Sequence, residues 1–441
     1  MTDVSVPGLR NLGNSCYFNA VLQALAASGC FQEYLTGLVE AGDVASEQRP
    51  FTSVLQQCLA DLSPQRRAYI SSVVPRDLNS MLSEDTSMFR GMHQQDAEEG
   101  FQFIMEKLEK EVNRSKPDAF SLSTLLPTRA PNSADTDTSS IHPFHGLTGN
   151  VLECSKCHMQ KPISTDYFLD LKLSLCPSMD SQRPFRTLRE SLRHYTRKEQ
   201  IDEVECTHCT FLQLLLAVDN ALHALAAAPY ADSRSFPTTT RSSEDPSDDD
   251  DRDARLFNFR RLRDMLSHRV ETNSGNPVCD VDLDDPHCWT PDQLSIWNAN
   301  TTFFQQLGIW DTDKRIPDLP RAHATFFRHV ILARPPKVLT FHINRNVYVH
   351  DTIVKLDVHL AFDESLRLAH PFVRHCEAIS YALVAVVVHH GNERGGHYTC
   401  YRRVTSARHW VHISDEHVVD VAFADVLRAK AYMLFYEITS P

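Results

Sequence analysis

Residues Gly8–Leu25 read GLRNLGNSCYFNAVLQAL and place one cysteine where a loop becomes a helix. Asn14 and Ser15 are residue types favoured at helix N-caps, and the apolar residues after Cys16 recur at helical spacing. Cys16 is therefore predicted in the first helical turn, where the helix dipole favours a thiolate and lowers the thiol pKa. Asn11 lies just upstream, so its amide could help to form an oxyanion hole. The alternative is a small buried cysteine without a chemical role.

A histidine that could activate this cysteine lies near the other end of the chain. Residues 381–403, YALVAVVVHHGNERGGHYTCYRR, are typical of a buried strand, a glycine-rich turn and a second strand that begins near His397. A cysteine and a histidine that are distant in sequence can meet in the fold and form a thiolate–imidazolium pair. His389 and His390 receive no role, because a lone histidine is more often structural. The residues alone thus predict a cysteine hydrolase.

Three motifs together resemble those of the ubiquitin-specific protease family: a cysteine box at Gly8–Leu25, an intervening box at Gln94–Ala97, and a histidine box at Gly395–Tyr398 with Trp410–Val418. They occur in the family's order, and the resemblance extends to Tyr436. It implies an α+β, papain-like cysteine protease fold, shaped as the thumb, palm and fingers of a right hand, and a deubiquitinase that hydrolyses ubiquitin isopeptides. The valine-rich run before His389 and the serine at 414 most resemble the family member of the mitochondrial outer membrane.

The resemblance also assigns the residues of the reaction. In the family an Asp or Asn orients the histidine, and the matching residue here is Ser414. A hydroxyl can accept a hydrogen bond from imidazole Nδ1–H, but it lacks the negative charge that stabilises imidazolium. Asp415 is expected to contribute that charge or to help to hold the oxyanion water network. The expected catalytic residues are Cys16, His397, Ser414, Asn11 and Asp415.

Residues around the intervening box are expected to contact the substrate. Gln95 and Asp96 could cap the next helix, and the resemblance implies that they hold the helix lining the channel for the substrate tail. Glu98-Glu99-Gly100 replaces the usual His-Glu-Phe. The glycines of the 391–396 turn would let the loop approach a glycine-only tail. The expected substrate-binding residues are Gln95, Asp96, Gly395, Gly396 and Tyr398.

Two Cys-x-x-Cys pairs predict a metal site. Cys154 with Cys157, and Cys206 with Cys209, are spaced as in a four-thiolate tetrahedral zinc site. Free thiols or a redox pair are the alternatives. The zinc would be structural, because four protein ligands leave no open position for water. By resemblance, it would stabilise the tip of a subdomain that grips ubiquitin.

Composition bears on partners and location. A net charge of −13 argues against sequence-independent binding to nucleic acid. The best apolar stretch, Phe211–Tyr230, is interrupted by polar residues, so we expect a soluble chain that makes no membrane contact itself. We also expect a monomer. With no signal peptide before Gly8, the cysteines are expected to be reduced and the protein cytoplasmic. It could instead lie on the cytosolic face of the mitochondrial outer membrane, if an anchor upstream of Met1 is missing.

The chain is expected to divide into a helical thumb at 7–120, fingers at 143–209 and 325–345, and a palm at 346–438. A strand is predicted at Tyr167–Leu175 and a helix at Leu188–Tyr195. The strands of the second lobe are predicted at Val338–Ile343, Ala382–His389, Tyr398–Val404, Trp410–Ile413 and Tyr432–Glu437.

The remaining segments are expected to be irregular in part. Residues Pro117–His142 are typical of a flexible surface connection. Residues 210–324 form a partly disordered insertion, in which Phe211–Ala228 and Leu294–Leu307 have helical spacing and Ser242–Asp253 is disordered. The acidic run there is either solubilising or a docking segment. Cys279 and Cys288 are interpreted as incidental.

Two other functions remain open. A catalytically weak scaffold of the same fold would bind ubiquitin without cleaving it, and the unusual Ser414 keeps that alternative in view. A papain-like protease for unfolded peptides would lack the cysteine pairs and need a signal peptide.

Overall fold

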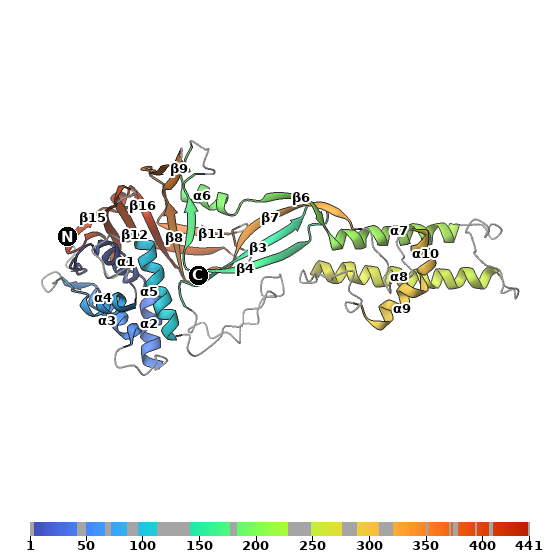
Figure 1. The fold of residues 1–441 in the computed structure, drawn as a ribbon, viewed down its shortest axis with the longest axis horizontal. Coiled ribbons are helices and arrows are strands. Elements are labelled where there is room, and N and C mark those ends of the chain that lie inside the picture. Colours follow the sequence, from blue (N-terminus) through green and yellow to red (C-terminus); the bar gives the residue numbers. More distant parts are fainter. Residues whose placement is uncertain are drawn as a thin grey trace.

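The structure is a computed structural model and is elongated, with helices and a large sheet at one end, a four-stranded sheet in the middle and a helical unit at the far end (Figure 1). The residues that it describes are 4–41, 50–66, 72–85, 96–112, 142–176, 183–227, 248–275, 289–307, 321–349, 352–369, 372–373, 378–392, 395–404 and 409–439. The predicted connection at 117–142 lies outside them except for His142, and Gln95, Cys279 and Cys288 also lie outside.

The first lobe is helical, as its periodicity predicts. It contains α1 (Cys16–Leu25), α2 (Gly29–Ala41), α3 (Phe51–Asp61), α4 (Arg76–Asp85) and α5 (Ala97–Val112), with a short pair β1 (Val4–Ser5) and β2 (Gln65–Arg66). Every residue of α1 is buried. This helix packs between α5 and the strands of the second lobe, so the chain around it has little freedom to shift.

The second lobe is one sheet in the order β15 (His417–Val421), β14 (His409–Ser414), β13 (Gly395–Val404), β12 (Ile379–Asn392), β16 (Ala431–Ile438), β8 (Val338–Asn344) and β5 (Leu171–Ser174), with β11 (Ser365–Leu368) also paired to β12. All pairings are antiparallel except that of β5 with β8. The five strands predicted for this lobe are confirmed. A short helix, α11 (Phe423–Leu427), precedes β16.

A separate four-stranded antiparallel sheet has the order β4 (Gln160–Phe168), β3 (Gly146–Cys154), β7 (His323–Arg334) and β6 (Glu199–Glu205). The expected fingers boundaries need correction, because β5 and β8 belong to the large sheet and only β7 of the 325–345 stretch lies here. The strand predicted at Tyr167–Leu175 is therefore two strands in different sheets. The predicted helix at Leu188–Tyr195 is α6, and the Thr187 side chain caps it by accepting from the Glu190 N–H.

The insertion forms a helical unit with its own core. It contains α7 (Thr207–Ala227), α8 (Asp248–Gly275), α9 (Pro291–Ala299) and α10 (Thr301–Gln306). Buried apolar side chains hold these helices together: Phe211, Leu214, Val218, Leu262, Met265, Leu266, Trp289, Trp297 and Phe304. Disorder was wrongly expected for Asp248–Asp253, which begin α8. The helix is held by apolar side chains further along, because Leu262, Met265 and Leu266 pack into this core.

Helix α7 is long and apolar enough to cross a membrane by length and composition alone. Its first turn carries Cys209, however, and Phe211, Leu214 and Val218 pack into the core of the insertion. Although only 28% of its apolar window is buried, these packing contacts place α7 in the helical unit.

A buried arginine joins the two lobes. Arg402 on β13 is 2 % exposed and donates to the Gln23 side chain at 2.9 Å and to the carbonyls of Leu62 at 3.0 Å and Ala26 at 2.6 Å. Ala26 and Leu62 are the C-cap residues of α1 and α3. Carbonyl groups at helix C-termini carry partial negative charge and stabilise a cation, although burial lowers the pKa of Arg402 to about 10. The second lobe is thus tied to the ends of two helices of the first.

Candidate active site

Cys16 is the first residue of α1, and Ser15 is the N-cap. The Ser15 side chain does not cap the helix as expected, because its hydroxyl accepts from the Leu12 N–H at 2.9 Å. The oxygen of Asn11 accepts from the backbone N–H groups of Gly13 and Ser15, at 2.9 and 3.2 Å. These bonds fold the loop into a compact turn immediately before the cysteine.

The two lobes meet at this turn. The Leu9 N–H donates to the Asp415 carbonyl at 2.9 Å. A Cβ at Gly8 would lie 2.5 Å from the Glu416 carbonyl oxygen, so only glycine permits this approach. The Cys16 thiol has a backbone hydrogen bond with Tyr398, the residue that follows His397. The structure thereby brings Cys16 and the His397 segment together, as the sequence predicted.

The pKa of the Cys16 thiol is raised, contrary to the expectation from the helix dipole. Burial is the largest cause, and the nearby Asp415 carboxylate also raises it, while backbone N–H groups at residues 398, 17 and 16 oppose the shift. The side chain is 4 % exposed, and loss of hydration outweighs these local dipoles. The helix N-terminus alone does not activate this cysteine.

His397 and Ser414 form a direct pair. The imidazole Nε2 lies 2.8 Å from the Ser414 hydroxyl oxygen. The two residues come from neighbouring strands, β13 and β14. The predicted pairing is present, but it uses Nε2 rather than the expected Nδ1, and Nδ1 remains available to another group.

Asp415 is held beside Ser414 in a left-handed backbone conformation, with φ of 51°. Its carboxylate accepts from the Asn11 amide at 2.9 Å and from the Asn19 amide at 2.7 Å. Asp415 thus positions the expected oxyanion residue. Asn19 was missed in the sequence, although an asparagine on the fully buried face of α1 was a signal that it has a polar partner.

Asp96 caps the start of α5, as the sequence predicts. Its Oδ1 accepts from the Glu98 N–H at 2.7 Å, which caps α5, and its Oδ2 accepts from the hydroxyl of Tyr432. Tyr398 also bonds to Asp96. Asp96 therefore links α5 of the first lobe to β13 and β16 of the second, beside Cys16. Its neighbour Gln95 lies outside the described residues.

Gly395 and Gly396 begin β13 opposite Asn392 and Gly391. A Cβ at Gly396 would meet the His390 carbonyl oxygen at 2.0 Å and the His389 side chain at 2.7 Å, so the pairing requires glycine there.

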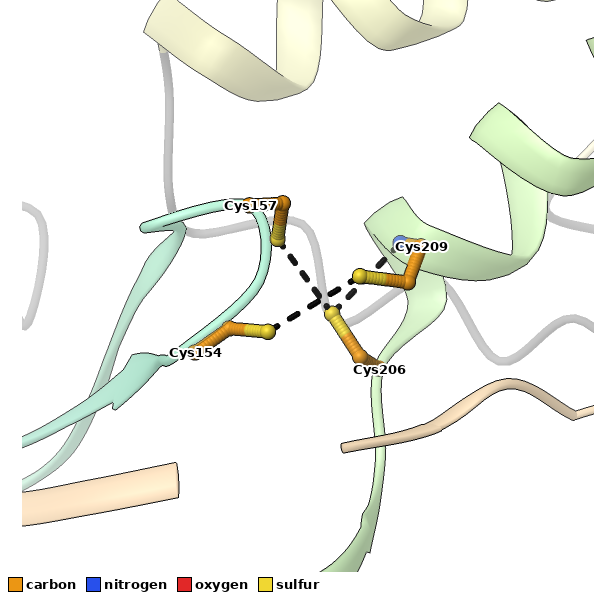
Figure 2. A group of neighbouring side chains, drawn as sticks. All are labelled: Cys154, Cys157, Cys206 and Cys209. Carbon is orange, nitrogen blue, oxygen red and sulfur yellow. Dashed lines mark hydrogen bonds between the residues drawn. The ribbon is translucent and has the colours of Figure 1, made fainter. Parts of the chain in front are cut away.

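The four cysteines of the two pairs converge (Figure 2). The sulfurs of Cys154 and Cys209 are 3.8 Å apart, and those of Cys157 and Cys206 are 3.6 Å apart. All four lie within 4.8 Å of one another. A tetrahedral ion about 2.3 Å from each sulfur separates the sulfurs by about 3.8 Å, so the cluster has the size of a four-thiolate metal site.

Comparison with known proteins assigns the family. The model of the ubiquitin carboxyl-terminal hydrolase family matches residues 7–436. The chain belongs to this family. Similar proteins include ubiquitin carboxyl-terminal hydrolase 30 of Danio rerio and of Homo sapiens, and ubiquitin carboxyl-terminal hydrolase 27 of Arabidopsis thaliana. Each is 25% identical to this chain, and each match covers 98% of this chain. The matches cover 85% of the Danio rerio protein, 84% of the Homo sapiens protein and 85% of the Arabidopsis thaliana protein.

Solved structures share the fold. One is the SAGA Ubp8/Sgf11/Sus1/Sgf73 DUB module bound to ubiquitin aldehyde, with a TM-score of 0.59 at 16% identity, covering 98% of this chain and 70% of that one. A second form of that module, bound to monoubiquitin, has a TM-score of 0.58 at 17% identity, covering 98% and 69%. The expected papain-like, right-hand fold is confirmed, with α1–α5 as the thumb, the large sheet as the palm and the four-stranded sheet as the fingers.

A buried cluster of titratable side chains lies at the start of α5. Glu98 stands where the family commonly has histidine, and it lies with Asp170 and His342 so that one donor atom of each is within 4.8 Å of the others. The Lys172 ammonium lies 3.1 Å from Glu98 and supplies the neutralising cation. Gln102 donates to Asp170. Burial, and then the Glu98 charge, raise the pKa of Asp170 to about 7.

This shift predicts a pH-dependent stability. An aspartate with a raised folded-state pKa binds a proton that the unfolded chain has already lost, so its contribution falls as the pH rises from about 4 to 7. Asp170→Asn keeps the acceptor for Gln102 and removes the buried charge. We expect it to raise the free energy of unfolding at pH 8, on the order of 2 kcal/mol, and much less at pH 5. Urea unfolding at the two pH values measures this, with the exposed Asp61→Asn as the control. An equal effect at both pH values would contradict the assignment.

Proposed function

We propose that Cys16 is the nucleophile and His397 the base with which this chain cleaves the isopeptide bond between the C-terminal glycine of ubiquitin and a lysine. As a member of the ubiquitin carboxyl-terminal hydrolase family, the chain is a deubiquitinase of the cysteine type. The observation that carries the residue assignment is the backbone hydrogen bond of the Cys16 thiol with Tyr398, next to the His397–Ser414 pair.

The reaction begins with proton transfer from the thiol. Ser414 accepts from His397 Nε2–H, which fixes the tautomer in which Nδ1 is the base. His397 Nδ1 takes the Cys16 proton as the sulfur attacks the isopeptide carbonyl. Because burial raises the pKa of the free thiol, the resulting imidazolium is needed to stabilise the thiolate.

The oxyanion that forms is stabilised by two donors. One is the Cys16 backbone N–H at the start of α1, and the other is the Asn11 amide. Asp415 accepts from one position of that amide, which orients it and leaves its second N–H for the oxyanion. Asp415 therefore acts on Asn11 rather than on His397.

Collapse of this intermediate expels the lysine amine, which takes the proton from His397, and leaves a thioester between Cys16 and ubiquitin. His397 then removes a proton from water, which attacks the thioester and restores the thiol. The substrate tail would run past Asp96, Tyr398 and the pair Gly395–Gly396 at the start of β13.

We further propose that Cys154, Cys157, Cys206 and Cys209 hold a structural zinc ion at the end of the fingers. The sulfur separations support this, and the Cys209 N–H lies 3.5 Å from the Cys206 sulfur, as in a knuckle that orients its ligands. Zinc would fix the ends of β3 and β6 and the beginning of α7.

The proposed partners are ubiquitin and ubiquitin-modified proteins, with the chain acting as a monomer in the cytoplasm. Similarity to ubiquitin carboxyl-terminal hydrolase 30 supports the cytosolic face of the mitochondrial outer membrane as a specific location.

Labelling with an electrophile tests the nucleophile. Ubiquitin bearing a C-terminal electrophile should form a covalent adduct with the protein, and Cys16→Ser should abolish it, whereas Cys30→Ser should still react. Intact mass and peptide mapping identify the modified residue. Binding without an adduct would instead favour the ubiquitin-binding scaffold.

Substitution of Ser414 tests how the histidine is oriented. Ser414→Ala removes the acceptor of Nε2–H, so kcat should fall about tenfold while KM changes little. Ser414→Asn restores an acceptor and should recover most of the rate. Steady-state hydrolysis of a fluorogenic ubiquitin amide measures both constants. Unchanged turnover in the alanine variant would mean that Ser414 does not orient His397.

Metal analysis tests the cysteine cluster. Protein purified without chelators should contain one zinc per chain, and Cys206→Ser should lower both the zinc content and the thermal midpoint. The buried Cys176→Ser, outside the cluster, serves as the control. Full zinc content in the Cys206 variant, or none in the wild type, would refute the site.

A further inference from the structure

A lysine joins two hairpins beside the catalytic histidine. Strands β9 (Asn346–Val349) and β10 (Thr352–Lys355) form a two-stranded ribbon outside the large sheet. The Lys355 ammonium, at the end of β10, lies 3.0 Å from His389 Nδ1, 3.1 Å from the His389 carbonyl oxygen and 2.8 Å from the Gly391 carbonyl oxygen. An ammonium has three donors, and all three have acceptors at the end of β12.

The position of these acceptors explains why a lysine is needed. The described pairing of β16 with β12 ends at Val388 opposite Ala431. The next carbonyls on the same edge of β12 are those of His389 and Gly391, because alternate residues of a strand point to the same side. Lys355 supplies the donors that a neighbouring strand would otherwise give.

From Lys355 the contacts lead to the catalytic residues. The His389 ring stacks on Tyr398, with ring centroids 4.3 Å apart and an angle of 14° between the planes. Tyr398 provides the backbone hydrogen bond to the Cys16 thiol. In the same hairpin His390 pairs with His397, and Gly391 pairs with Gly396. The residues that Lys355 holds are therefore the direct neighbours, across the strands, of the histidine base and of the glycine pair.

The charge on Lys355 also defines the state of His389. Nδ1 can accept from an ammonium only when it carries no proton, so His389 is neutral. Burial, followed by the Lys355 charge, lowers the pKa of His389 to about 4, with Asp96 opposing and His390 assisting the shift. This neutral ring stacks nearly flat on Tyr398.

We propose that Lys355 is a positioning residue, which clamps the β12–β13 turn to the β9–β10 ribbon and so fixes His397 and the glycine pair relative to Cys16. The inference rests on the proposed function, because it assigns Lys355 a part in the same reaction. Lys355 itself does not touch the substrate or the reacting atoms. Its effect passes through the backbone of residues 389–391 and through the His389 ring.

The test compares Lys355→Met, which keeps a similar side-chain length but removes the donors, with Lys355→Arg, which keeps the charge and donors. The exposed Lys110→Met on α5, whose partner is Glu106, is the matched control. We expect Lys355→Met to lower kcat for a fluorogenic ubiquitin amide about tenfold, with a smaller change in KM, because small displacements of a catalytic group carry large rate penalties. Lys355→Arg should recover most of the rate, and Lys110→Met should equal the wild type.

A second readout separates positioning from a loss of folding. The pKa of His389, followed by NMR of the imidazole protons, should rise from about 4 in the wild type when Lys355 is replaced by Met, and the thermal midpoint should stay close to that of the wild type. A Lys355→Met variant as active as Lys110→Met, or one whose rate is not improved by arginine, would overturn the clamp. A wild-type protein that fails to react with ubiquitin bearing a C-terminal electrophile would instead overturn the proposed function.

Discussion

The junction between the two lobes depends on a buried arginine, Arg402, which bonds to a side-chain amide and to backbone carbonyls. Its Nη1 and Nη2 groups donate to the Gln23 side chain and to the C-cap carbonyls of α1 and α3, so the dipoles of two helices stabilise its charge. It lies on the same strand as His397, and α1 begins at Cys16. Its hydrogen bonds therefore help to fix the helix that begins at Cys16 relative to the strand that carries His397. A shorter or neutral residue would leave the helix ends unpaired inside the protein.

Burial at the same junction also changes the pKa of the Cys16 thiol. Close contact of Gly8 with the backbone at 415–416 and full burial of α1 exclude water from Cys16, and this raises the pKa of its thiol. In the proposed reaction this thiol therefore needs His397, paired with Ser414, to accept its proton. Asp415 accepts from the amides of Asn11 and Asn19, so its observed contacts are with the residue proposed for the oxyanion and not with His397.

The sequence predicted most elements whose pattern is local. The helical spacing after Cys16, the five strands of the palm and the capped helix at Leu188–Tyr195 are all present, because apolar periodicity and capping residues act within a few positions. The sequence failed where the answer depends on distant contacts. The pKa of Cys16, the choice of Nε2 over Nδ1 at His397, and the partners of Asn19 and Lys355 follow from burial and from strands that meet only in the folded chain. The acidic start of α8 was misread because its helix is stabilised by packing further along.

Backbone and side-chain hydrogen bonds hold the helical insertion where it joins the fingers. The Cys206 N–H donates to the Ala322 carbonyl at 2.8 Å, and the Ala322 N–H donates to the Thr210 hydroxyl at 3.0 Å. The two ends of the insertion are therefore hydrogen-bonded to each other, next to the four sulfurs. Because its two ends meet at one place, the length of the insertion is not set by a distance that it has to span.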